Sequence, residues 1–305
     1  MDDFIIAENL KHVYKGGTVA LDDVNLTIGT GLFGLLGSNG AGKSTFMRII
    51  CTLLMPTHGR VRVGGLDVVA DRRQVRKLFG YLPQEFGAWR LQRVEEVLNT
   101  LALLSGLEDA NTRKQRIAEM LAAVGLEKVA DRKVKHLSGG MLRRLGVAQA
   151  LVHEPKILIM DEPTVGLDPE ERLRFRQLMA ELSRDRIILL STHIVADLGS
   201  GCSDLALIDH GKVQFRGSPS ELIALAQNKV CEVAVAEIAE AEVSERMEVV
   251  ARTARSGVIT LRGVIKDSAV PAGARMVNDI TLEEAYLAFM AGRGRHVDEL
   301  AMTDS

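Results

Sequence analysis

One short glycine-rich segment restricts the possible fold more than any other part of the sequence. Residues 37–45 read GSNGAGKST and satisfy the pattern G-x-x-x-x-G-K-[ST] through Gly37, Gly42, Lys43 and Ser44. An apolar run comes directly before the segment, and apolar residues at helical spacing follow it. Glycines in such a turn allow backbone N–H groups to surround phosphate groups, and the N-terminus of the following helix faces them. The segment therefore predicts a phosphate-binding loop in which Lys43 contacts the terminal phosphates and Ser44 holds Mg²⁺.

Short apolar runs elsewhere predict the sheet that carries this loop. They lie at residues 31–36, 157–160, 187–190 and 205–208, and longer stretches with helical periodicity separate them. Continuous apolar runs of this length are typical of strands in a buried, largely parallel sheet. We therefore predict an α/β fold in which a strand, the glycine-rich turn and a helix follow one another between residues 32 and 54.

A different pattern fills residues 92–134, where apolar side chains recur at helical spacing on two successive stripes. This pattern predicts a helical subdomain inserted into the α/β core, over about residues 85–150. The stripes consist of Val94, Val97, Leu98, Leu101 and Leu104, followed by Ile117, Met120, Leu121 and Val124.

The last part of the chain predicts a second, smaller domain. Short alternating runs at residues 232–236 and 258–264 lead to an amphipathic helix near residues 282–290. We therefore divide the chain into a large phosphate-binding domain, residues 1–228, and a small α+β accessory domain, residues 229–305.

Two adjacent carboxylates end the predicted strand in the segment ILIMDEP, residues 157–163. Because successive side chains of a strand point to opposite faces, Asp161 and Glu162 have different orientations. Asp161 suits the Mg²⁺ shell, and Glu162 suits a general base for an attacking water molecule. Taken alone, the segment fits equally well a strand that simply exits to solvent through charged residues. The phosphate loop upstream favours the catalytic interpretation.

A third segment, LSGGM at residues 137–141, combines a serine and two glycines at the predicted start of a helix. A serine hydroxyl and glycine N–H groups at a helix N-terminus can hold an anion. Taken alone, a Ser-Gly-Gly sequence is more often a flexible turn.

The order of these motifs resembles the ATPase domain of ATP-binding cassette (ABC) proteins. The phosphate loop is followed by Gln84 in GYLPQE, by LSGGM, by ILIMDEP, by GLDP at residues 166–169 and by STH at residues 191–193. The resemblance covers roughly residues 4–222. It implies a P-loop NTPase core with an antiparallel β edge from the N-terminal segments, and it places LSGGM on the helical subdomain. One position departs from the family, because the signature usually ends in glutamine where this chain has Met141.

The resemblance also implies roles for individual residues. Gln84 would sense Mg²⁺ and the attacking water, and His193, which taken alone is better interpreted as a structural histidine, would contact the γ-phosphate. The signature would contact ATP held by the opposite subunit, and Asp168 would lie across the subunit interface. Tyr14 matches the aromatic residue on which adenine stacks, with an ordinary surface or core aromatic as the alternative. The implied catalytic residues are Glu162, His193 and Gln84. The implied metal ligands are Ser44, Gln84 and Asp161. The implied nucleotide contacts are Tyr14, Gly37, Ser38, Asn39, Gly40, Ala41, Gly42, Lys43, Ser44, Thr45, Ser138, Gly139, Gly140 and Asp168.

The same resemblance implies a function. Such chains bind ATP and Mg²⁺, hydrolyse the ATP and work as head-to-tail dimers with two composite sites. The segments GYLPQE, STHIVADL and ITLEEAYLAFM are similar to those of the ATPase subunits of bacterial ABC-2 type exporters. Such subunits act at the cytoplasmic face of the cell membrane through a separate permease subunit. The second ATPase subunit would be another copy of this chain or a homologous subunit. The alternatives are an importer motor, or a soluble ABC ATPase of translation or DNA maintenance. The single phosphate loop and the lack of sustained heptads disfavour that soluble ATPase.

Composition limits the partners and the compartment. Lys and Arg number 38, Asp and Glu number 40, and the net charge is −2, so there is no overall positive field to attract nucleic acid. The three cysteines indicate neither a disulfide framework nor a zinc site. The N-terminus lacks the basic and apolar regions of a signal peptide, and the apolar runs are shorter than the roughly 20 residues that cross a bilayer. We therefore expect a cytoplasmic protein that reaches the membrane through its permease.

The segment after Gln84 indicates where a permease would dock. Phe86 and Trp89 are apolar residues in an otherwise loop-like stretch. In one interpretation they line a groove for a short helix of the membrane subunit. In the alternative, both side chains belong to the core of the helical subdomain.

Overall fold

The chain divides into two compact units, Met1–Arg216 and Gly217–Ser305. The computed structural model describes residues 4–236, 240–255, 258–266 and 270–294. The division between the units lies nearer the N-terminus than the expected position after residue 228. This is because helix α7 (Pro219–Leu225) packs against helix α9 (Leu282–Ala291) and so belongs to the C-terminal unit.

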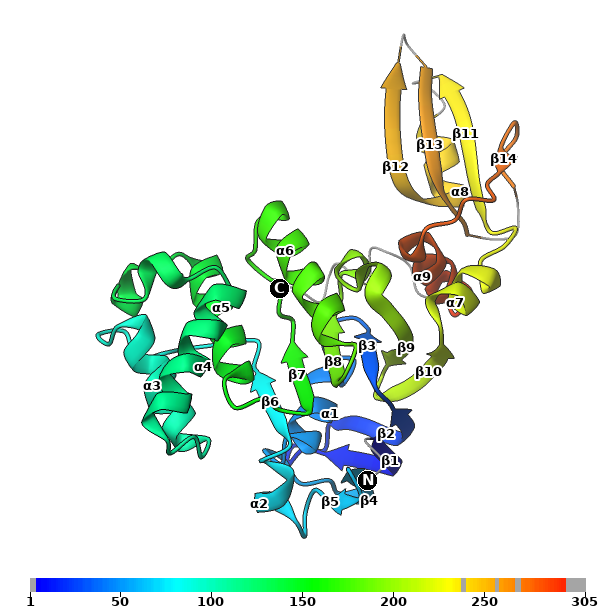
Figure 1. The fold of residues 1–305 in the computed structure, drawn as a ribbon. Helices are drawn as coiled ribbons and strands as arrows, with labels where there is room; N and C mark the ends of the chain where they lie inside the picture. The colour runs from blue at the N-terminus through cyan, green and yellow to red at the C-terminus, as the bar shows by residue number, and fades with distance from the viewer. Residues whose placement is uncertain (1–3, 237–239, 256–257, 267–269, 295–305) are drawn as a thin grey trace. The chain divides into compact units, whose positions relative to one another are not determined.

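A six-stranded sheet forms the centre of the N-terminal unit, with the strand order β10-β9-β3-β8-β7-β6 (Figure 1). The pairs from β9 across to β6 are parallel. The four predicted apolar runs are all strands of this sheet, and they are buried on both faces, which explains their continuous apolar character. The strands are β3 (Gly31–Leu36), β6 (Phe79–Leu82), β7 (Ile157–Asp161), β8 (Ile187–Thr192), β9 (Cys202–Asp209) and β10 (Lys212–Gly217).

The N-terminal segments form an antiparallel sheet of their own, in the order β2-β1-β4-β5. Helix α1 (Lys43–Ile50) contacts both sheets, and its residues Phe46 and Ile49 join one apolar core with them. The phosphate loop is therefore anchored at the start of a helix that two layers of strands hold in place. The strands of this second sheet are β1 (Ile5–Val13), β2 (Val19–Ile28), β4 (His58–Val63) and β5 (Leu66–Asp67).

Helix α1 ends at Ile50, earlier than the predicted end near residue 54. Thr52 has a φ of 58°, in the left-handed region through which a right-handed helix does not continue. Leu53 is 58% exposed, so this residue does not extend the buried stripe of the helix. The short helix α2 (Arg72–Val75) follows the second sheet and leads to β6.

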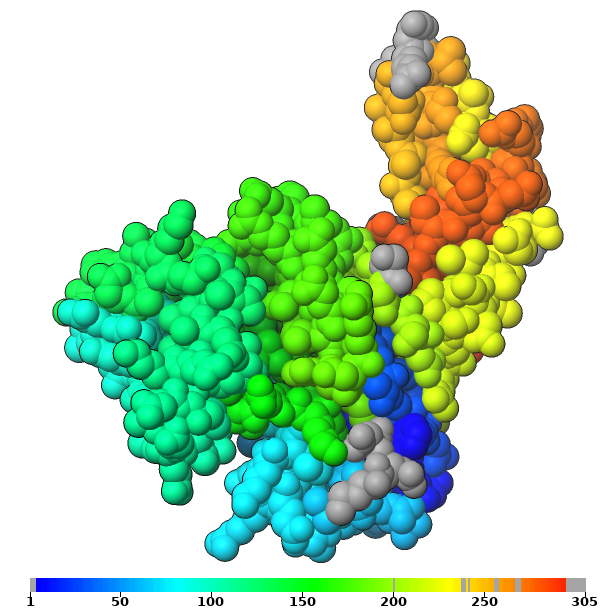
Figure 2. All heavy atoms as spheres, viewed as in Figure 1, coloured from blue at the N-terminus to red at the C-terminus, as the bar shows by residue number. Residues whose placement is uncertain are grey.

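Helices between the neighbouring strands β6 and β7 form the inserted subdomain. In Figure 2 they gather in one lobe of the surface, coloured cyan to green. Val94, Val97, Leu98 and all four residues of the second predicted stripe are buried. Leu104 is 74% exposed because the helix ends there, so the first stripe is shorter than predicted. The helices are α3 (Val94–Leu104), α4 (Ala110–Ala123) and α5 (Gly139–Leu151), and α6 (Pro169–Leu182) comes after β7.

The C-terminal unit is an α+β domain with a four-stranded sheet in the order β12-β13-β11-β14. Its core contains Cys231, Val233 and Leu261. Both predicted alternating runs are strands of this sheet, and the predicted final helix is α9. The strands are β11 (Val230–Ala236), β12 (Met247–Arg255), β13 (Val258–Ile265) and β14 (Arg275–Met276), and α8 (Glu240–Arg246) lies between β11 and β12 along the chain. Within the described ranges, no helix combines the length and the apolar character that crossing a membrane requires.

Candidate functional site

The glycine-rich loop connects the end of β3 to the start of α1. Gly40 and Gly42 have φ values of 76° and 111°, which favour glycine. A Cβ atom on Gly37 would lie 2.3 Å from the carbonyl oxygen of Ile208, and one on Gly42 would lie 2.5 Å from that of Ala20. Backbone packing thus explains the glycines at these positions. No described side chain caps α1 or places a carboxylate in its first turn, so the positive end of the helix faces the loop.

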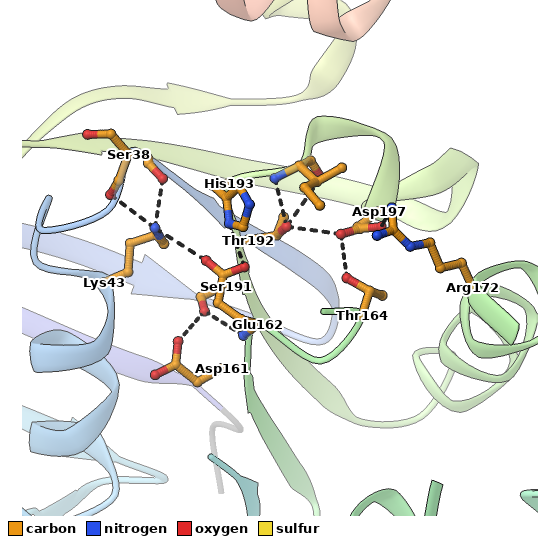
Figure 3. Close-up of polar contacts among 12 residues, drawn as sticks. Ser38, Lys43, Asp161, Glu162, Thr164, Arg172, Ser191, Thr192, His193 and Asp197 are labelled. Atoms are coloured by element: carbon orange, nitrogen blue, oxygen red, sulfur yellow. Dashed lines mark hydrogen bonds and ion pairs between the residues drawn. The ribbon is translucent and has the colours of Figure 1, made fainter. Parts of the chain in front are cut away.

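The side chain of Lys43 points back into the phosphate loop that precedes it. Its Nζ atom donates hydrogen bonds to the carbonyl oxygens of Gly37 at 2.7 Å and Ser38 at 3.1 Å (Figure 3). The same atom lies 3.5 Å from Oε1 of Glu162, and the lysine side chain is only 5% exposed. Burial lowers the pKa of the Lys43 ammonium group, and the carboxylates of Glu162 and Asp161 oppose this effect. A buried cation is therefore aimed at the space where phosphate groups would lie.

Asp161 ends β7 and Glu162 directly follows it, and their carboxyl groups point in different directions (Figure 3). Asp161 accepts a hydrogen bond from the hydroxyl of Ser191 at 2.5 Å. Glu162 instead directs Oε2 to Nδ1 of His193 at 2.8 Å and Oε1 toward Lys43. Both carboxyl groups are buried. Glu162 has a φ of 49°, and its N–H donates to the carbonyl oxygen of Ser191 at 3.2 Å.

Sequence reasoning missed a buried carboxylate behind these residues. Asp197 accepts hydrogen bonds from the hydroxyls of Thr192, at 3.1 Å, and Thr164. Thr192 directly precedes His193, and Thr164 follows Glu162 by two positions. Asp197 therefore ties together the two segments that carry Glu162 and His193 (Figure 3). The only sequence signal was an acidic residue shortly after STH.

A cavity of about 360 Å³ brings most of the predicted nucleotide residues together. Tyr14 lies at its edge, 38% exposed, and its hydroxyl is 3.0 Å from that of Thr45. The rings of His12 and Tyr14 form a T-shaped pair with a centroid distance of 4.7 Å. Arranged in this way, the tyrosine has a fixed ring face beside the phosphate loop. The lining comprises Tyr14, Thr18, Val19, Ala20, Ser38, Asn39, Gly40, Ala41, Gly42, Lys43, Ser44, Thr45, Gln84 and Glu162.

The signature segment and Asp168 are not among the residues that line this cavity in the part of the chain that the structure describes. Ser138 caps α5 by accepting a hydrogen bond from the N–H of Met141 at 3.1 Å. Asp168 caps α6 by accepting one from the N–H of Glu171 at 2.8 Å. Gly139 and Gly140 form the first turn of α5. One chain therefore uses Ser138 and Asp168 as helix caps, and the predicted contacts across a dimer stay predictions.

The predicted Mg²⁺ ligands fit a metal held jointly with phosphate. Ser44 and Gln84 line the cavity, and Asp161 directly precedes Glu162, which also lines it. Hydroxyl, amide and carboxylate oxygens are ligands that Mg²⁺ accepts, and this ion usually takes few protein ligands and shares the rest with substrate phosphates. The described residues contain no cluster of three or more His, Cys, Asp or Glu side chains that could hold a metal by themselves.

Comparisons with known proteins agree with this geometry. A family model described as ABC transporter matches residues 21–165. The chain is 38% identical to the Nod factor export ATP-binding protein I of Rhizobium sp. (strain N33), over 72% of this chain and 73% of that protein. It is 33% identical to the linearmycin resistance ATP-binding protein of Bacillus subtilis (strain 168), over 77% and 76%. A solved dimeric structure of an ATP-binding cassette bound to ADP and Pi matches with a TM-score of 0.65 and 27% identity, over 70% of this chain and 98% of that chain.

The chain belongs to the ATP-binding proteins of ABC transporters. It is an ATPase that binds ATP, and it serves as the motor subunit of a membrane transporter. Cassettes of this kind form dimers. The family and the activity that the motifs implied are thereby confirmed.

Proposed function

We propose that Glu162 is the general base that activates water for ATP hydrolysis in this ATPase. The observation that carries the proposal is the convergence of its buried carboxylate on Lys43, at 3.5 Å, and on His193, at 2.8 Å, beside the phosphate loop. Phosphate groups of ATP would take over the contact with Lys43. Glu162 would then accept the proton of the attacking water while His193 contacts the γ-phosphate.

The other residues of the cavity bind and orient the nucleotide. The loop amides and Thr45 would hold the phosphates, and the ring of Tyr14 would stack on adenine. Ser44, Gln84 and Asp161 would hold Mg²⁺, which neutralises charge on the phosphate oxygens.

A dimer would complete each site. Ser138, Gly139 and Gly140 would contact the γ-phosphate of ATP on the opposite subunit, and Asp168 would lie at the interface between the subunits. The support is that these residues begin helices α5 and α6 but do not line the cavity of their own chain. The opposite subunit is a second copy or a homologous ATPase. ATP then joins the two subunits, and hydrolysis separates them.

Two substitutions test the chemistry. Glu162→Gln should keep ATP binding and lower the hydrolysis rate by about 100-fold or more, because a general base is lost. Lys43→Ala should weaken ATP binding itself. Both are measured as phosphate release and as equilibrium binding of ATP. If purified Glu162→Gln protein hydrolysed ATP at the wild-type rate, the assignment of the base would be wrong.

A groove on the helical subdomain supports docking of a permease. Its volume is about 490 Å³. Trp89 is 47% exposed, whereas Phe86 is half-buried against α5, so one of the two aromatic residues is in the subdomain and the other is open to a partner. The groove would receive a short helix of a membrane permease, which would place this subunit at the cytoplasmic face of the membrane. Export is the direction that the name of the Nod factor relative supports. The groove is lined by Phe86, Gly87, Ala88, Trp89, Val97, Leu101 and Gln149.

The docking proposal is tested with the double substitution of Phe86 and Trp89 by alanine. It should reduce co-purification with the permease and leave ATP binding of the isolated subunit intact. Leu104→Ala is the matched control, since this leucine is 74% exposed on the same subdomain but is not part of the groove. Unchanged co-purification of the double variant, or a globally unfolded double variant, would contradict the proposal.

A further inference from the structure

Two consecutive arginines on α5 point to different parts of the molecule. Arg144 reaches the end of α4, where it donates to the carbonyl oxygens of Val124 at 3.0 Å and Gly125 at 3.2 Å, and it pairs with Glu171 at 3.2 Å. Arg143 is 7% exposed and turns toward the catalytic strand instead. From sequence, the pair gives no sign that one of the two is buried.

All five N–H donors of the Arg143 guanidinium go to backbone carbonyl oxygens. Such complete use of a buried guanidinium fixes every backbone segment that it touches. The acceptors belong to two places, the loop after β6 and the end of β7. The bonds run from Nη1 to Pro83 at 2.8 Å and Gln84 at 2.7 Å, from Nη2 to Asp161 at 2.7 Å and Glu162 at 2.6 Å, and from Nε to Pro163 at 2.9 Å.

We propose that Arg143 is the positioning residue that holds Gln84 and Glu162 in register with each other for ATP hydrolysis. It binds the backbone carbonyl oxygens of both residues and leaves their side chains free for the roles proposed in the cavity. The inference rests on the proposed roles of Glu162 and Gln84, and it adds a residue that is not among those lining the nucleotide cavity.

The backbone of Glu162 needs such support. Its φ of 49° lies in the left-handed region, which is unfavourable for a residue with a side chain and persists only where the surroundings determine it. Ser191 binds the N–H of Glu162 and Arg143 binds its carbonyl oxygen. The two bonds hold the peptide groups before and after Glu162 in place. The side chain is thereby directed toward Lys43 and His193.

Arg143 also connects these residues to the signature. It lies on the second turn of α5, the helix that Ser138 begins. A shift of this helix therefore acts on the carbonyl oxygens of Gln84 and Glu162 at once. The start of α5, the loop that carries Gln84 and the proposed base behave as one hydrogen-bonded unit, so hydrolysis depends on how α5 is seated.

Lysine is the informative replacement. An ammonium group keeps the charge but has three donors on a flexible stem, and it cannot reproduce a planar five-bond arrangement. Arg143→Lys should lower kcat by tenfold or more, with ATP affinity within about threefold of wild type, because the Lys43 loop is untouched. Arg144→Lys makes the same chemical change one position along the helix and should keep kcat within about threefold. It is the matched control.

The measurements are kcat and KM for ATP hydrolysis, equilibrium binding of ATP, and the melting temperature of each variant, with Arg143→Gln as a second variant. A selective loss of kcat in both Arg143 variants supports the proposal. Wild-type kcat in Arg143→Lys, an equal loss in Arg144→Lys, a parallel loss of ATP binding, or failure of both Arg143 variants to fold would each overturn it. Glu162→Gln is measured alongside. If Glu162→Gln is inactive and Arg143→Lys is normal, only the role of Arg143 fails, whereas an active Glu162→Gln removes the proposed base itself.

Discussion

Tyr14 illustrates how little burial is needed to fix a side chain at the nucleotide cavity. Its hydroxyl is hydrogen-bonded to that of Thr45 and its ring forms a T-shaped pair with that of His12, although the residue is 38% exposed. If its ring stacks on adenine, Tyr14→Ala should weaken ATP binding by about tenfold or more, since one base stack is worth about 1–3 kcal/mol. Tyr14→Phe keeps the ring and should stay within about threefold of wild type.

Titration calorimetry with ATP measures both effects. Inorganic tripolyphosphate is the control ligand because it has no base, and neither substitution should change its affinity. Equal weakening of ATP and tripolyphosphate in Tyr14→Ala would show that the tyrosine supports the loop and does not bind the base.

Residue types and spacing were enough to predict several of the side chains that meet at the site, but not what holds them. The motifs predicted Lys43, Asp161, Glu162 and the phosphate loop together, and strand alternation predicted that the two carboxylates diverge. The hydroxyl of Ser191 on Asp161 was not predictable, because it depends on the register in which β8 lies beside β7. The contacts of Arg143 were not predictable for a similar reason. Its acceptors are backbone carbonyl oxygens, which every residue carries, so they leave no signal in the sequence.

Among the elements, helix α9 offers a test of electrostatics away from the nucleotide. Glu284 is 2% exposed, accepts from Arg262 at 2.5 Å and from the N–H of Thr281 at 2.8 Å, and belongs to a capping box. Burial raises the pKa of this carboxyl group, but the bonds from Arg262 and Thr281 outweigh it, so the pKa lies below its ordinary value. A lowered pKa in the folded state means stabilisation that is present above the ordinary pKa and disappears as pH falls through the lowered one.

Glu284→Gln should therefore destabilise the C-terminal unit by about 2 kcal/mol at pH 7, the value of a hydrogen-bonded charge. The difference from wild type should shrink as the pH falls through the lowered pKa, where the wild-type carboxylate becomes protonated as well. Urea unfolding at pH 7 and across the acidic range, followed through the transition of this unit, gives the comparison. Glu283→Gln, on the exposed side of the same helix, is the control. A penalty that stays constant with pH would mean that shape, and not charge, matters at this position.

Periodicity predicted the existence of elements better than their ends or their partners. Every predicted apolar run of the α/β core is a strand. These strands could be predicted because a parallel strand that is buried on both faces gives a continuous apolar run. The end of α1 was missed because Leu53 continues the apolar pattern while Thr52 breaks the helix. The separate antiparallel sheet was expected only as an edge, since alternation within a strand does not say which sheet the strand joins.

At the scale of the whole molecule, the sequence predicts a site that one chain does not complete. The signature begins α5 on the helical subdomain, while the cavity forms around the phosphate loop in the core. A division into two units was also expected, but its position was not, because the contact of α7 with α9 joins segments far apart in the sequence. How two subunits pair depends on the shape and charge of their surfaces, which cannot be derived from a single sequence.

Mixing two inactive chains tests the composite site directly. One chain carries Lys43→Ala, which removes the phosphate contact, and the other carries Ser138→Arg, which blocks the signature. In a head-to-tail heterodimer of the two, one site contains both lesions and the other contains neither. Random pairing makes half of the dimers mixed, each with one intact site of two, so an equimolar mixture should recover about a quarter of wild-type ATP hydrolysis. The control replaces the second chain by a Lys43→Ala, Ser138→Arg double variant, which leaves a lesion in every site and should recover nothing. Two affinity tags verify that mixed dimers form. Co-purified heterodimers without activity, beside a wild-type mixture that is active, would contradict catalysis across the interface and would confine Ser138 to its role as the cap of α5.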